Sequence, residues 1–151
     1  MQPTLEQVRQ LRSQGNVIPV YRSVIADLLT PVSAFLKLER NQNHAFLLES
    51  VEGGETVARY SFLGCNPFHI AKYRGGEPAN FVQTLRSTMS RFRLVKLPNL
   101  PPFTGGAVGY FGYDMIRTIE EIPKSSRDDL GIEDAFLMFY KTVLAFDHLR
   151  H

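Results

Sequence analysis

The chain has 151 residues, of which 44% are hydrophobic and 21% are charged, and its formal net charge is +2. This composition is typical of one ordinary globular domain that is long enough to bury a core. Basic and acidic residues are interspersed, which argues against nucleic-acid binding, and no apolar run approaches the roughly 20 residues of a membrane span. The amino terminus lacks the layout of a signal peptide and Cys65 is the sole cysteine, so we expect a cytoplasmic protein without an internal disulfide.

Two helices are predicted near the amino terminus. A capping box at residues 4–7 begins the first helix, and Gly15 is expected to end it. Thr30-Pro31 begins the second helix, because proline is favoured in the first helical turn. Between the helices, residues 17–21 are predicted to be extended, and the proline at their centre confines them to a sheet edge or a bulge.

Three strands are predicted in the middle of the chain, over residues 44–49, 57–63 and 68–73. Each is an apolar run, and the turn-forming pairs Gly53-Gly54 and Asn66-Pro67 separate them. Short gaps of this kind favour an antiparallel meander, in which each strand pairs with the next.

A third helix and a glycine-rich strand are predicted next. Asn80 is expected to cap the helix, and one apolar stripe along it is typical of core packing. This stripe comprises Phe81, Val82, Leu85, Met89 and Phe92. The glycines in residues 103–114 fit neither a dinucleotide fingerprint nor a P-loop. We interpret this segment as a strand with bulges, in which bare backbone lets another layer approach closely.

Residues 135–147 are apolar on both alternating faces, which is typical of a central strand covered on both sides. The sequence ends soon afterwards, without the neighbouring strand that a central strand needs, so we expect a fragment of a longer protein. The elements together predict an α+β fold, a mostly antiparallel sheet with helices packed on it. We expect residues 1–151 to form a single domain and one half of a larger two-layer, sandwich-like subunit.

Three polar side chains are expected to converge at one end of the first predicted hairpin. Glu49 and Ser50 stand at the end of the first strand, and Arg59 lies on the returning strand. An anion, a neutral hydrogen-bonding group and a cation are what the ammonium and carboxylate groups of a free amino acid need. The alternative is an ordinary solvated strand end, because buried charge is costly unless it is paired.

Two motifs carry a resemblance to a known family. Residues 47–50 (Leu-Leu-Glu-Ser) are followed by residues 58–64 (Ala-Arg-Tyr-Ser-Phe-Leu-Gly), and residues 103–114 have the pattern F-x-GG-x-x-GY-x-x-YD. In this order the motifs resemble the amino-terminal domain of anthranilate synthase component I, the chorismate-using subunit that begins tryptophan synthesis. The resemblance covers nearly the whole chain but only the first part of such a subunit.

The resemblance implies a regulatory role, because in this family the Leu-Leu-Glu-Ser strand lines an allosteric tryptophan pocket. It implies that Glu49 and Ser50 take the amino group and nearby polar groups of L-tryptophan, and that Arg59 takes its carboxylate. The indole wall would come from apolar and aromatic neighbours, although alternation along a strand prevents all of them from facing it. These neighbours are Leu47, Leu48 and Tyr60.

We find no catalytic constellation and no metal-ligand spacing in the sequence. The paired acids at 120–121 and 128–129 lie in a polar segment and are interpreted as solvated. The resemblance agrees, because in the family the chorismate and magnesium residues lie in the carboxyl-terminal half. It further implies that the complete enzyme is a lyase, which converts chorismate and glutamine or ammonia to anthranilate and pyruvate with magnesium. A glutamine amidotransferase subunit, component II, would be its partner, and no cofactor is expected in this chain.

Two alternatives stay open. Aminodeoxychorismate synthase component I shares the fold and parts of both motifs, although the intact motifs at 47–50 and 58–64 favour the anthranilate branch. The other alternative is a free-standing amino-acid-binding module without chemistry. None of these alternatives has a nucleic acid or a membrane as its partner.

Overall fold

The computed structural model describes residues 1–49, 59–75, 78–123 and 127–149. It contains two antiparallel sheets of three strands each, which confirms the predicted α+β class. The first sheet has the order β1-β2-β6, with β1 at Ala45–Leu48, β2 at Tyr60–Cys65 and β6 at Leu144–Asp147. The second has the order β3-β5-β4, with β3 at His69–Tyr73, β4 at Gly106–Phe111 and β5 at Ala135–Tyr140.

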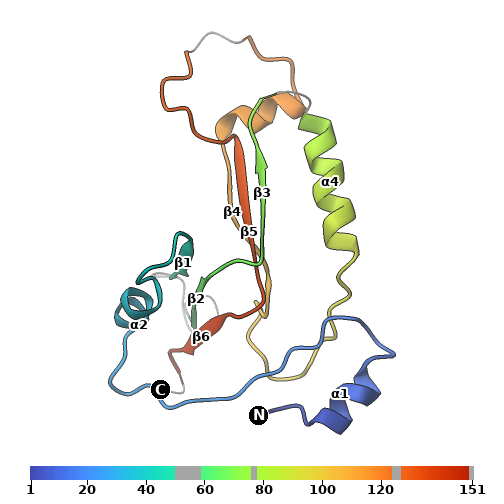
Figure 1. The fold of residues 1–151 in the computed structure, drawn as a ribbon, viewed down its shortest axis with the longest axis vertical. Helices are drawn as coiled ribbons and strands as arrows, with labels where there is room; N and C mark the ends of the chain where they lie inside the picture. Colours follow the sequence, from blue (N-terminus) through green and yellow to red (C-terminus); the bar gives the residue numbers. More distant parts are fainter. Residues whose placement is uncertain (50–58, 76–77, 124–126, 150–151) are drawn as a thin grey trace.

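Helices α2 and α4 lie against different sheets, and α1 lies apart from the strands (Figure 1). Helix α2 packs on β1 and β2, whereas α4 runs beside the second sheet and contacts β3. The bounds are Leu5–Leu11 for α1, Pro31–Leu38 for α2, Pro78–Ser90 for α4 and Tyr113–Thr118 for the 3₁₀ helix η1. None of the helices in the described ranges combines the length and the apolar character that crossing a bilayer requires.

Local capping signals correctly predict the starts of α1 and α2. Thr4 and Gln7 cap each other's backbone N–H groups, with distances of 2.8 and 3.3 Å, and Thr30 and Ser33 do the same at the start of α2. The prediction that Gly15 ends α1 is wrong, because α1 ends at Leu11. Gly15 is buried instead, and a Cβ there would collide with a backbone carbonyl of the segment after α4.

The predicted meander is corrected by the structure. Strands β1 and β2 pair, but β3 lies in the other sheet, so the predicted meander breaks after β2. Asn66 has a φ of 57°, a left-handed conformation that asparagine tolerates, and Pro67 follows it. This Asn-Pro turn leads the chain out of the first sheet. Residues 17–21, predicted to be extended, form no named strand but contribute two isolated bridges, a parallel one between Val17 and Leu94 and an antiparallel one between Gln2 and Tyr21.

The apolar stretch 135–147 is two strands in two sheets rather than one long strand. Strand β5 ends at Tyr140, and after three residues β6 begins in the other sheet. The prediction that a neighbour of the central strand is missing is therefore wrong for β5, because β3 and β4 pair with its two edges. Its central position is confirmed, since Ala135 and Phe139 are 0% and 2% exposed.

An aromatic cluster joins the two sheets on the face of β1 and β2 that also carries Leu48. Phe46 of β1 lies with its ring 4.8 Å from that of Tyr140 in β5 and 6.3 Å from that of Phe103, in edge-to-face geometry. Gly64 pairs with Phe46 across β1 and β2, and a Cβ at Gly64 would lie 2.6 Å from the Phe46 ring. A glycine at this position therefore makes room for the ring.

The stripe on α4 is only partly buried by this chain. Phe81 contacts Tyr73 with ring centroids 5.3 Å apart, but Met89 and Phe92 are 41% and 43% exposed. The predicted core packing is therefore confirmed for the first part of the stripe and wrong for the last part. Helix α4 begins at Pro78, so Asn80 lies inside the helix and not at its cap.

The glycine-rich segment forms β4, as predicted, but without bulges. Its residues pair one for one with β5 from Gly106 to Phe111. The expected close approach occurs at Gly109, where a Cβ would collide with the carbonyl oxygen of Phe136 in β5. Glycine at this position therefore allows β4 and β5 to approach closely.

We expect the 151-residue chain to self-associate when it is produced alone. Leu28, Tyr113 and Ile119 are 97%, 84% and 80% exposed, and β6 pairs on one edge only among the described residues. Exposed apolar side chains and an unpaired strand edge both favour association. Light scattering at high concentration should detect dimers or larger species, and a monodisperse monomer would contradict the expectation.

Candidate functional site

The predicted ligand residues lie at the end of β1 and the beginning of β2. Leu48 is the last residue of β1 and pairs with Phe62, and Glu49 follows it with an exposed side chain. Tyr60 opens β2 and is half-buried. The structure therefore brings Leu48 and Glu49 near the strand that carries Tyr60. Ser50 lies outside the described residues.

The strand register decides which apolar residues share a face. Leu48 is opposite Phe62, and Tyr60 is two residues from Phe62, so Leu48 and Tyr60 lie on the same face of the sheet. Leu47 is opposite Leu63 and lies on the other face. The Tyr60 and Phe62 ring centroids are 6.0 Å apart. This face offers an aromatic surface with a half-exposed leucine beside it, whereas Leu47 cannot contribute to it.

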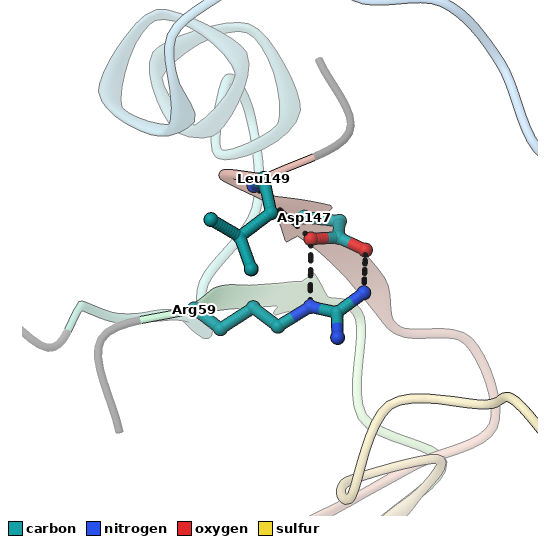
Figure 2. A network of polar contacts seen from close by, with 3 residues as sticks. All are labelled: Arg59, Asp147 and Leu149. Atoms are coloured by element: carbon teal, nitrogen blue, oxygen red, sulfur yellow. Dashed lines mark hydrogen bonds and ion pairs between the residues drawn. The ribbon is translucent and has the colours of Figure 1, made fainter. Parts of the chain in front are cut away.

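Arg59 makes a two-pronged ion pair with Asp147 (Figure 2). Arg59 Nε donates to Asp147 Oδ1 at 2.9 Å, and Nη2 donates to Oδ2 at 2.7 Å. The guanidinium carbon lies 4.9 Å from the centroid of the Tyr60 ring, in a cation–π contact. The hydrogen bond to Asp147 raises the pKa of Arg59 above its ordinary value, so the cation is present at every physiological pH. A fixed cation beside an aromatic ring is thus available for an anionic group.

A second polar contact lies at the same end of the β2–β6 pair. Ser61 Oγ and His148 Nε2 share a hydrogen bond of 2.7 Å, and Ser61 is 1% exposed. The backbone N–H of His148 also donates to the backbone carbonyl of Arg59 at 2.9 Å. Both ends of Arg59, its backbone and its guanidinium, are therefore held by the segment 147–148.

The sequence does not predict Asp147 and His148 as neighbours of Arg59. The apolar pattern puts Asp147 at the end of a long central strand, and nothing in its spacing links it to residue 59. One signal points to such a partner. A half-buried arginine needs a counter-charge, and an acidic residue at the end of an apolar strand can supply it. That signal alone does not identify which acid is the partner.

Two hollows in the described part of the chain lie away from these residues. One, of about 560 Å³, lies between α1 and the segment around Pro98, and a smaller one of about 500 Å³ lies beside the end of α4. Neither hollow includes Glu49, Arg59 or Tyr60 among its lining residues. What the described residues offer at the predicted site is an open surface with one exposed carboxylate, one held cation and an aromatic face.

Within the described residues, no group of three or more histidine, cysteine or acidic side chains has the geometry to hold a metal ion. Glu49, Arg59 and Tyr60 supply a carboxylate, a cation and an aromatic ring, and the contacts join Arg59 to Tyr60. The hydroxyl–imidazole pair beside them, Ser61 with His148, has its serine 1% exposed, so that hydroxyl is closed to a substrate.

The comparisons with known proteins agree with the motifs. No family model matches the chain. It is 44% identical to anthranilate synthase component 1 of Acetivibrio thermocellus and 39% identical to that of Synechocystis, in each case over 98% of this chain and 32% of the relative. It is 38% identical to the probable anthranilate synthase component 1 of Schizosaccharomyces pombe, over 97% of this chain and 30% of the relative.

A solved structure also matches. The crystal structure of anthranilate synthase component I from Streptococcus pneumoniae covers 86% of this chain, and the match covers 29% of that chain, with 29% sequence identity and a TM-score of 0.46. The chain spans about a third of the length of the curated relatives it matches. Over that third, the chain is homologous to the amino-terminal part of anthranilate synthase component 1.

Proposed function

We propose that this chain is the regulatory amino-terminal region of an anthranilate synthase large subunit and that it carries part of a feedback site for L-tryptophan. The observation that supports this most strongly is the 44% identity over 98% of the chain to a relative named anthranilate synthase component 1. The placement of Glu49, Arg59 and Tyr60 at one end of the β1–β2 pair is compatible with it.

The roles of the site residues follow from their chemistry. The Arg59 guanidinium takes the carboxylate of tryptophan, and the exposed Glu49 carboxylate takes the ammonium group together with Ser50. Leu48 and Tyr60 share a face of the sheet and provide a surface for the indole ring. Further residues of the complete protein enclose the ligand, so this chain alone binds tryptophan weakly or not at all.

The complete protein, on this proposal, is a cytoplasmic lyase that forms anthranilate and pyruvate from chorismate and an ammonia source. A glutamine amidotransferase subunit supplies the ammonia. Magnesium supports the reaction, but the described residues of this chain do not fit a magnesium site, because they hold no cluster of acidic or histidine ligands. We therefore place the metal and the chemistry outside the described residues.

The aminodeoxychorismate branch is the second candidate. The names of the relatives described above favour the anthranilate branch. Complementation separates the two: the intact gene should rescue a tryptophan auxotroph and not a folate auxotroph. Rescue of the folate auxotroph alone would favour the second candidate.

We expect purified residues 1–151 to form no anthranilate, and the intact protein to form it with inhibition by tryptophan. Fluorimetry of anthranilate after addition of chorismate, ammonia and magnesium tests both. Because the 151 residues include no tryptophan, indole emission in a titration of this chain reports only added ligand. Anthranilate formation by the chain alone would overturn its assignment as non-catalytic, and an intact protein insensitive to tryptophan would overturn the feedback site.

A further inference from the structure

The guanidinium of Arg59 has two usable edges, and Asp147 occupies one of them. Asp147 accepts hydrogen bonds from Nε and from one N–H of Nη2, with distances of 2.9 and 2.7 Å. A guanidinium carries five N–H donors, so three remain: two on Nη1 and one on Nη2. None of these three has a partner among the described residues, and Figure 2 shows the remaining nitrogen on the side away from the carboxylate.

The Asp147 carboxylate is itself held in place. Asp147 lies opposite Tyr60 in the β2–β6 register, and its Oδ1 also accepts the backbone N–H of Leu149 at 3.2 Å. The Arg59 and Asp147 side chains are 29% and 22% exposed, so water screens their interaction less than at an open surface. A bidentate pair of this kind fixes the plane of the guanidinium as well as its position.

The backbone beneath the pair is fixed too. Ser61, which is 1% exposed, shares a hydrogen bond of 2.7 Å with His148, and the N–H of His148 donates to the carbonyl of Arg59 at 2.9 Å. The free edge of the guanidinium consequently has one orientation, beside the Tyr60 ring. An arginine side chain that is not held by such contacts would lose rotamer freedom when it binds a ligand, which opposes binding.

We propose that Asp147 is a positioning residue for the tryptophan site: it holds one edge of the Arg59 guanidinium so that the opposite edge receives the carboxylate of the ligand. This inference rests on the proposed function. Asp147 does not touch the ligand in this arrangement, and it acts through Arg59. Its contribution is therefore confined to ligands that carry a carboxylate.

The test uses Asp147→Asn in the intact protein and two ligands, L-tryptophan and L-tryptophanamide, with Kd measured by calorimetry. The amide keeps the indole and the ammonium group but lacks the carboxylate. We expect the Kd for tryptophan to rise about tenfold, within the usual range of coupling in one hydrogen-bonded network. The Kd for tryptophanamide should stay unchanged, which also shows that the variant is folded.

Two further variants sharpen the result. Asp128→Asn removes the carboxylate of another arginine pair, that with Arg74 at 3.3 Å, and should leave both Kd values unchanged. In an Arg59→Lys background, which cannot make the bidentate pair, Asp147→Asn should add no further loss for tryptophan. Such non-additivity is the signature of one residue acting through the other.

The outcomes distinguish failure of the positioning role of Asp147 from failure of the tryptophan site itself. If Asp147→Asn weakens the binding of both ligands equally, Asp147 only stabilises the pairing of β2 with β6. The positioning role is then overturned, while the feedback site stands. If it tightens tryptophan binding, Asp147 competes with the ligand for Arg59, and positioning is again overturned. If the unmodified intact protein binds neither ligand, the proposed function itself fails and this inference fails with it.

Discussion

Replacing Ser50 by phenylalanine in the intact protein is expected to relieve inhibition by tryptophan while turnover without tryptophan stays near normal. Ser50 follows Glu49 at the end of β1, where the proposed site receives the amino group of the ligand. A larger side chain there takes the volume of the ligand, and overpacking of this kind costs about 1–3 kcal/mol. Binding should weaken roughly ten- to a hundredfold. The dependence of anthranilate formation on tryptophan concentration measures the effect.

Matched variants separate loss of the site from general damage. Glu49→Ala should also relieve inhibition, because it removes the partner of the ammonium group. His44→Ala should not, since His44 lies at the other end of β1 and stacks on Phe136 with ring centroids 5.5 Å apart. Ser90→Phe makes the same change at an exposed position on α4 and should be silent. Wild-type sensitivity in Ser50→Phe with unchanged turnover would show that the pocket assignment is wrong.

Gly109→Ala in the intact protein is expected to lower the free energy of unfolding by about 3 kcal/mol or more. The added Cβ would collide with the carbonyl oxygen of Phe136, and its next neighbours are the carbonyl carbon of Phe136 and the Cα of Leu137. All three are backbone atoms of the central strand β5, so relief requires a strand to move rather than a side chain to rotate. Urea denaturation, followed by circular dichroism, measures the loss.

Gly112→Ala is the matched control, with the same substitution at the end of the same strand. There the added Cβ would lie 3.1 Å from the carbonyl oxygen of Asp134, a contact that a small adjustment relieves. We expect Gly112→Ala to cost about 1 kcal/mol or less, as is usual away from large clashes. Equal stability of the two variants would contradict the close approach of β4 and β5 at Gly109.

Elements that depend on local chemistry were predicted well from the sequence. The reciprocal hydrogen bonds of Thr4 with Gln7 need residues three apart, so the pattern alone locates the helix start. The strands were likewise predicted from apolar runs. The pairing of β1 with β2 was predicted as well, but the partners of β3 and β6 were not. Residues 141–143 contain neither glycine nor proline, and an alternating apolar pattern does not tell which of two sheets a strand joins. The chain changes sheets there without a local signal.

The same division holds for the candidate site. Glu49 and Arg59 flank two strands that follow each other closely in the sequence, so the sequence predicts that both lie at one end of a hairpin, and β1 and β2 do pair. Asp147 could not, because it lies 88 residues from Arg59 and reaches it only through the β2–β6 pairing. Long-range pairing depends on the whole topology, which local periodicity does not specify.

The position of β2 between β1 and β6 has a consequence for the order in which the chain assembles during synthesis. One edge of β2 can pair with β1 as soon as the hairpin has left the ribosome, since translation delivers the amino-terminal elements first. The other edge stays open until residues 144–147 emerge and close a long loop, which makes this contact a slow one. Until then Arg59 cannot form its ion pair with Asp147. The proposed recognition surface is therefore completed among the last steps of translation of this region.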